Sequence, residues 1–202
     1  MRKVARKELL LVAVSIAVLA ISHTFASVFV YYPVTVNLLP VNPPVRFQPG
    51  SNANRDDLGG SGFPYTGHTI GVSIGPDGAS LELTLHPTKQ HNYYLDVSRI
   101  ENADDKAYYI TVRVITAATL PSGSVARLLI YDAPSGGSIA IDVNLLATGD
   151  TPTPPVAIPA GAVWRIDLYI FIPEGSSVSG TPTASLQLIY SPSDETPPEV
   201  PP

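Results

Sequence analysis

Hydrophobic and polar side chains alternate along much of this 202-residue chain, and this alternation limits its possible folds more than any other feature. The pattern is regular in residues 80–86, 108–114, 139–145 and 164–172. Successive side chains of a β-strand point to opposite faces, so the alternation places one face in a core and the other in water. Further segments rich in β-branched and aromatic residues, each bounded by turn formers, are residues 68–74, 93–100, 124–131 and 184–190. The sequence therefore predicts an all-β protein.

Turn-forming residues separate the predicted strands. Short clusters of Gly, Pro, Ser, Asn and Asp occur at residues 75–78, 102–105, 121–123, 134–137 and 173–175. Eight strands at this spacing, with longer loops at residues 40–67 and 147–161, predict a two-sheet β-sandwich. The chain has no cysteine and so lacks the Cys–Trp–Cys pattern of immunoglobulin domains, which favours a jelly-roll-like arrangement. We expect this domain to span residues 41–190 and to be followed by an extended, mobile, proline-rich tail, residues 191–202.

The N-terminus has the layout of a secretory signal peptide. Residues 1–7 carry four basic residues, and residues 9–21 are apolar except for Ser15. Thr24 and Ala26 place small residues at positions −3 and −1 for cleavage between Ala26 and Ser27. The alternative is a retained anchor, but the apolar run of 13 residues is short for a membrane span, which needs roughly 20. We predict a signal peptide at residues 1–26, a secreted extracellular protein, and no membrane partner after cleavage.

A second hydrophobic segment, residues 27–40, follows the predicted cleavage site. As a strand it would place on one face Val28, Val30, Tyr32, Val34, Val36 and Leu38. This strand is either the first strand of its own sandwich or a donor strand that completes the sheet of an adjacent copy. Donor and groove are different surfaces, so the second arrangement would not close and would propagate as a filament. The expected partners are then identical subunits in a homopolymer.

Composition excludes several classes of function. Removing residues 1–26 leaves 8 Lys and Arg against 16 Asp and Glu, so the predicted mature chain is acidic and has no basic stripe for nucleic acid. The mature chain would also lack both cysteine and methionine, so its stability must come from packing and hydrogen bonding.

Catalytic motifs are missing. His68, His86 and His91 do not follow zinc-protease spacing, and the sequence contains no GxSxG elbow. Three acidic residues lie inside predicted strands, where we interpret them as part of a solvated face: Asp96, Asp142 and Asp167. We therefore predict that the protein is not an enzyme and has no catalytic residues.

No cofactor is expected from the sequence. Oxygen ligands that calcium prefers cluster in two predicted loops, at Asn52, Asn54, Asp56 and Asp57 and at Asp104 and Asp105. Neither group has the spacing of an EF-hand loop, so calcium is retained only as an alternative.

The pattern of strands and turns resembles the archaeal bundling pilins and, more distantly, the bacterial TasA/camelysin biofilm-fibre family. The resemblance is carried by residues 27–39, 94–102, 107–114 and 158–168. It implies a secreted jelly-roll subunit that polymerises by donor-strand exchange into filaments, which bundle and hold biofilm cells together. Camelysins have been described as metalloproteases, and the missing zinc motif argues against that activity here. The alternatives are a monomeric carbohydrate- or surface-binding sandwich, a secreted hydrolase with an acidic site, and a calcium-dependent tubule subunit.

Overall fold

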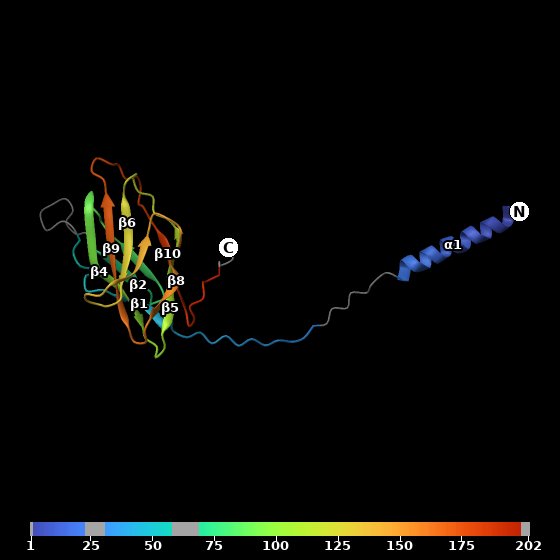
Figure 1. Cartoon of the computed structure of the whole chain (residues 1–202), viewed down its shortest axis with the longest axis horizontal. Helices are drawn as coiled ribbons and strands as arrows, with labels where there is room; N and C mark the ends of the chain where they lie inside the picture. Colours follow the sequence, from blue (N-terminus) through green and yellow to red (C-terminus); the bar gives the residue numbers. More distant parts are fainter. Residues whose placement is uncertain (1, 23–30, 58–68, 199–202) are drawn as a thin grey trace. The chain divides into compact units, whose positions relative to one another are not determined.

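The computed structural model describes residues 2–22, 31–57 and 69–198 of the chain (Figure 1). The chain separates into two units, Met1–Pro40 and Val41–Pro202. The first unit contains helix α1 (Arg2–Ser22), which includes the apolar run of the predicted signal peptide. In the described residues, no helix combines the length and the hydrophobicity that crossing a membrane requires.

The described part of the second unit is built from antiparallel β-strands. They are β1 (Val45–Pro49), β2 (Gly71–Ile74), β3 (Leu81–Thr84), β4 (Gln90–Asn102), β5 (Tyr108–Thr116), β6 (Val125–Tyr131), β7 (Ile139–Asn144), β8 (Gly149–Ile158), β9 (Val163–Ile172) and β10 (Ser185–Ser191). One sheet has the order β1-β4-β9-β6-β7, a second has the order β10-β5-β8, and β2 and β3 form a hairpin. The predicted all-β sandwich is confirmed.

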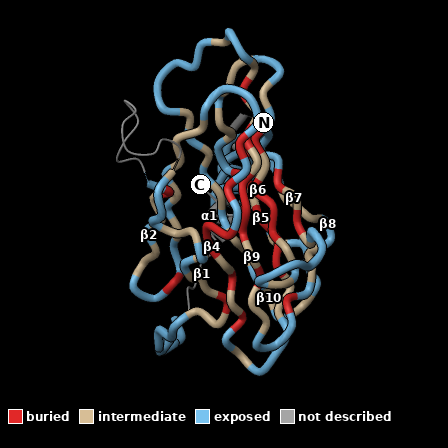
Figure 2. The backbone as a smooth tube through the Cα atoms, turned by 90° about the vertical axis from the view of Figure 1, so that its left-hand side faces the viewer, coloured by how far each residue is buried: buried red, intermediate tan, exposed pale blue. Residues whose placement is uncertain are grey.

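A single hydrophobic core joins the two larger sheets. Alternate residues of β5 (Ile110, Val112 and Val114) are at most 5% exposed and belong to the same buried cluster as residues of β4, β6, β7 and β9. Figure 2 shows this burial along the strands, with exposed backbone in most of the loops that join them. The period-two pattern of the sequence thus becomes the inner face of each sheet.

The predicted turns at four positions are confirmed by hydrogen bonds. The Gly78 amide donates to the Gly75 carbonyl at 2.9 Å, and Gly78 has a φ of 74°, which glycine adopts without strain. The Asp104 amide donates to the Asn102 side chain at 3.1 Å, as an Asx-turn requires. Equivalent turn bonds close on the carbonyls of Pro121 and Pro173.

The prediction of two long loops was wrong, because each of these segments contains a strand. Residues 40–67 include β1, and residues 147–161 include β8. Both strands contain proline, which lacks an amide hydrogen and is normally read as a strand breaker, but which an edge strand tolerates. Each of these strands lies at the edge of its sheet.

The jelly-roll arrangement stays a prediction. In an eight-stranded jelly roll the first strand lies beside the last strand of the chain. Here the first strand, β1, pairs with β4 in the five-stranded sheet, while the last strand, β10, pairs with β5 in the other. The observed order therefore departs from a regular jelly roll at β1.

Two isoleucines of β7 test how the core stabilises the fold. Ile141 is 1% exposed and Ile139 is 49% exposed, so only Ile141 should leave a large cavity when truncated. We expect Ile141→Ala to lower the free energy of unfolding by about 2–5 kcal/mol. Ile139→Ala serves as the matched control and should have a much smaller effect. Fluorescence of Trp164, the single tryptophan of the chain, follows unfolding in urea, and equal losses for both variants would contradict this account of the core.

Candidate assembly site

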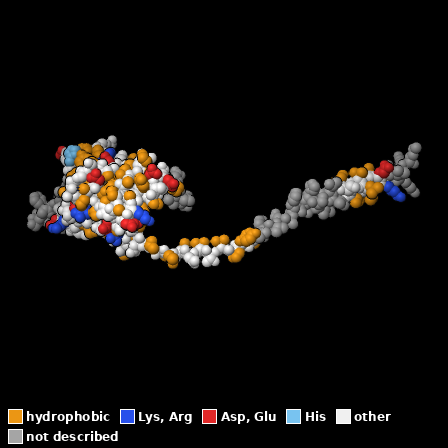
Figure 3. Space-filling model, turned by 60° about the horizontal axis from the view of Figure 1, so that its bottom comes forward, with side chains coloured by type: hydrophobic (Ala, Val, Ile, Leu, Met, Phe, Trp, Pro, Cys, Tyr) orange, Lys and Arg blue, Asp and Glu red, His pale blue; other side chains and the backbone are white. Residues whose placement is uncertain are grey.

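The N-terminal unit carries an exposed hydrophobic segment at residues 31–40. These residues have no regular secondary structure. Four predicted donor residues, Tyr32, Val34, Val36 and Leu38, are between 71% and 82% exposed. Figure 3 shows hydrophobic side chains at the surface of this segment. The predicted donor residues Val28 and Val30 and the predicted cleavage site at Ala26 and Ser27 lie outside the described residues.

The composition of this segment suits a β-strand. Residues 31–39 carry no charge, and the positions that alternate with the apolar ones include Thr35 and Asn37. Val34, Thr35 and Val36 are β-branched, which favours the extended backbone of a strand. Neighbouring large apolar side chains that remain in water are typical of surfaces that bind another protein. The segment therefore has the composition of a strand with one apolar face.

A cluster of polar side chains lies where β4 and β9 pair irregularly. We call Tyr93, Asp96, Arg99, Arg165 and Asp167 the β4–β9 polar cluster. The register of β4 against β9 shifts between Tyr94 and Ser98, and Asp96 within this bulge has a φ of 47°. The bulge turns the Asp96 amide toward Asp167, whose Oδ1 accepts its hydrogen bond at 2.6 Å.

Each buried carboxylate of the cluster is paired with an arginine. Two nitrogens of Arg99 donate to the two oxygens of Asp96, at 2.9 and 2.6 Å, and Arg165 Nε donates to Asp167 Oδ1 at 2.9 Å. The Ser51 amide also donates to Asp96 Oδ2 at 3.0 Å. Burial raises the pKa of Asp96, but the bonds from Arg99 and Ser51 outweigh burial and lower the pKa to about 2.

The tyrosines complete the cluster at its surface. The Tyr93 hydroxyl donates to Asp167 Oδ2 at 2.7 Å and lies 3.0 Å from the Tyr131 hydroxyl. Burial, together with these hydrogen bonds, raises the pKa of Tyr93, so its hydroxyl stays protonated. The Arg165 guanidinium lies 4.3 Å from the centroid of the Tyr131 ring, a cation–π contact. The charges are therefore balanced inside the cluster, which fixes the bulge rather than offering a reactive group.

The interpretation of the strand acids as a solvated face was wrong for two of them. Asp96 is 5% exposed and Asp167 is 0% exposed, because the bulge and the arginines cover them. Asp142, which pairs with Arg127, has a side chain that is 38% exposed and fits the interpretation. The sequence contained a signal for the pairing: Arg165 and Asp167 are two residues apart on one strand and so share a face.

The two described histidines of the sandwich, His86 and His91, have different partners. His86 Nδ1 lies 3.1 Å from Asp57 Oδ2, and the same oxygen accepts the His86 amide at 2.9 Å. His91 stacks on Phe171 and lies 2.6 Å from the Tyr169 hydroxyl. His68 lies outside the described residues.

Three of the residues considered for calcium bond to the backbone. Asn52 donates to the Leu95 carbonyl, Asn54 accepts from the Val72 amide, and Asp104 accepts from the Asp105 amide. In the described ranges, no three or more acidic or histidine side chains are grouped in a way that could hold a metal ion.

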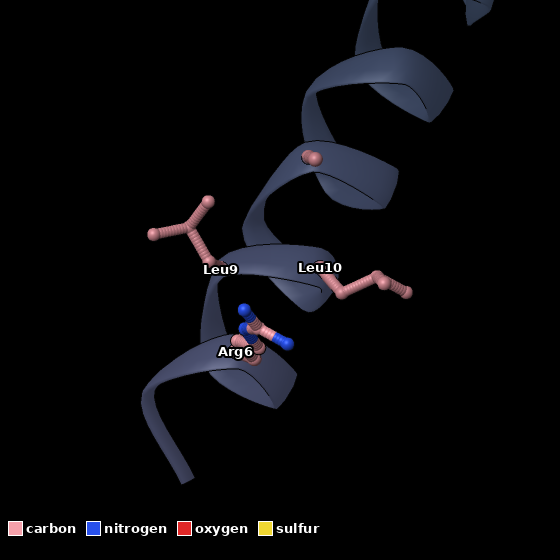
Figure 4. Close-up of a pocket in the computed structure, with 4 residues that line it drawn as sticks. Arg6, Leu9 and Leu10 are labelled. Atoms are coloured by element: carbon pink, nitrogen blue, oxygen red, sulfur yellow. The ribbon is translucent and has the colours of Figure 1, made fainter. Parts of the chain in front are cut away.

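A shallow hollow on α1 is lined by Arg6, Leu9, Leu10 and Ala13 (Figure 4). In the close-up Leu9 and Leu10 point away from each other on the surface of this one helix. The hollow lies within the predicted signal peptide and brings no group of polar or reactive side chains together.

Comparison of the chain with protein-family models and with curated proteins finds no match. The functional interpretation therefore rests on the residues and their arrangement.

The pairing of Asp96 predicts a pH-dependent stability. Its folded pKa of about 2 lies below its ordinary value of 3.8, so its contribution is present above about pH 4 and is lost as the pH falls toward 2. We expect Asp96→Asn to cost on the order of 2 kcal/mol at pH 7 and to flatten the unfolding free energy between pH 4 and 2. Asp142→Asn, in the more exposed pair, is the control and should cost under about 1 kcal/mol. Identical pH profiles for wild type and Asp96→Asn, measured by Trp164 fluorescence, would contradict this assignment.

Proposed function

We propose that this protein is the structural subunit of an extracellular filament and that it polymerises by donor-strand complementation. In this proposal residues 27–39 of one copy insert as a strand into the sandwich of the next copy. The filaments bundle and mediate cohesion between cells. The single observation that carries the proposal is the exposed, uncharged and alternating segment at residues 31–39.

The β-sandwich supports the proposal because its strands come from elsewhere in the chain. Every strand of the described second unit lies between Val45 and Ser191. Residues 31–39 are thus not a strand of the sheets in which the core is built. Residues 31–39 have the composition of a buried strand, but they belong to none of the described sheets. They are therefore suited to pairing with a second copy.

The energetics favour full strand insertion over a loose contact. Burying Tyr32, Val34, Val36 and Leu38 would contribute at most about 6–12 kcal/mol, at roughly 1.5–3 kcal/mol for each side chain. Association costs roughly 4–15 kcal/mol in lost freedom of motion. Burial of these four side chains therefore offsets the cost of association only if that cost lies toward the lower end of its range. Backbone hydrogen bonds along an added strand would supply the remainder and would make the junction long-lived.

Deletion of residues 27–39 tests the donor role. We expect the shortened protein to be a monomer in size-exclusion chromatography and to form no fibres in negative-stain microscopy, while the full-length chain forms fibres. Fibres from the shortened protein would refute donor-strand assembly. A full-length chain that stays monomeric with an N-terminus near Ser27 would favour the carbohydrate- or surface-binding alternative.

A pair of point variants separates side-chain burial from a general effect of charge. Val34→Asp places a carboxylate on the face that is buried after insertion, whereas Thr35→Asp places it on the opposite face. We expect Val34→Asp to abolish fibres and Thr35→Asp to retain them. Equal behaviour of the two variants in a sedimentation assay would argue against insertion of an alternating strand.

A further inference from the structure

The acceptor for the donor segment can be sought among the edges of the sheets. A sheet edge presents unpaired amide and carbonyl groups, and soluble proteins protect their edges with proline, charge or a covering segment. The two larger sheets have four edge strands: β1 and β7 in one, and β10 and β8 in the other.

Three of these edge strands are protected. β8 contains Pro152, Pro154 and Pro155, and it lies beside β7, which contains Asp142. β1 contains a charged residue and ends at a proline, and its Phe47 amide donates to the Gly78 carbonyl of the β2–β3 turn at 2.8 Å. Proline removes the donor that a new strand would need, and a charge on the edge opposes its approach.

The edge at β10 lacks the proline and the charged residue that protect the other edges. Its seven residues, Ser185–Ser191, include no proline and no charged residue. In the part of the chain that the structure describes, β10 pairs only with β5. It is also the last strand of the chain's sandwich, beside which an eight-stranded jelly roll would place its first strand.

The core is incompletely covered at the same edge. Three residues of β10, Leu186, Leu188 and Tyr190, pair with Val114, Val112 and Ile110 of β5. Those β5 residues are at most 5% exposed, whereas Tyr190 is 37% exposed and the two leucines are only partly buried. An additional strand on this side would extend the inner face of the sheet and cover these side chains.

We propose that the outer edge of β10 is the acceptor, and that residues 31–39 of a second copy pair with it. This inference rests on the proposed function. Donor and acceptor are both uncharged and both alternate apolar with polar side chains, so pairing buries apolar rows on one face without charge repulsion. At about 3.3 Å per residue the donor segment is long enough to cover all of β10.

Proline in the donor fixes which backbone groups face β10. In a strand, the amide and carbonyl groups of alternate residues point to the same side. Pro33 has no amide hydrogen. The side of the strand formed by the odd-numbered residues therefore lacks one hydrogen-bond donor. The side that faces β10 is therefore formed by the backbone groups of Tyr32, Val34, Val36 and Leu38. These residues also carry the apolar side chains that join the core.

Cysteine cross-linking tests the acceptor, and the natural chain contributes no cysteine of its own. Thr35→Cys is combined in turn with Ser185→Cys, Gln187→Cys and Ile189→Cys, three outward-facing positions of β10 that cover neighbouring registers. The control combines Thr35→Cys with Ala140→Cys on the β7 edge. Each full-length variant is oxidised under assembly conditions and run on a denaturing gel without reductant.

We expect at least one β10 combination to give a ladder of covalent polymers that reductant collapses to monomer, and the β7 combination to stay monomeric. Fibres in microscopy without a ladder from any β10 combination would overturn the acceptor assignment and leave the proposed filament intact. A ladder only from the β7 combination would do the same. Absence of fibres from the wild-type chain and all variants would overturn both proposals, and Trp164 fluorescence establishes that each variant is folded.

Discussion

The ladder between β4 and β9 is the interaction on which the rest of the structure depends. It lies at the centre of the larger sheet, with β1 bonded to β4 on one side and β6 bonded to β9 on the other. Its inner face supplies Ile100, Trp164 and Ile166 to the core. Its outer face holds the arginine-paired carboxylates of Asp96 and Asp167 at the bulge. The ladder thus fixes both the packing between the sheets and the curvature of the sheet.

The bulge in this ladder also determines where the preceding chain segment lies. The Gly50 amide donates to the Val97 carbonyl at 3.2 Å, and a side chain at Gly50 would meet the Asp96 carbonyl oxygen at 2.0 Å. Only glycine allows this approach between the end of β1 and the bulge. β1 is thereby held against β4, and it is not beside β10. In the described part of the chain, the outer edge of β10 therefore has no pairing with β1.

The strands that could be predicted from the sequence are those in which apolar and polar side chains alternate. Segments such as residues 164–170 alternate without interruption and form strands at the predicted place. β8 was not predicted because its prolines obscure the alternation, and an edge strand tolerates them where a central strand would not. The burial of Asp96 was equally hidden, since a bulge depends on the pairing of two strands and leaves no local mark in the sequence. The proposed donor segment was visible as a pattern, whereas its proposed acceptor required the strand order.

The ion pairs within the fold have a consequence for how such a polymer would respond to its surroundings. Arginines 99, 127 and 165 each pair with an aspartate of the same chain. The segments proposed to join at the junction, residues 31–39 and β10, carry no ionisable group except tyrosine. In the proposed filament, screening by salt would therefore act on contacts between the acidic outer surfaces of neighbouring filaments and would have little electrostatic effect on the uncharged axial junctions. Salt would then control the thickness of bundles independently of filament length.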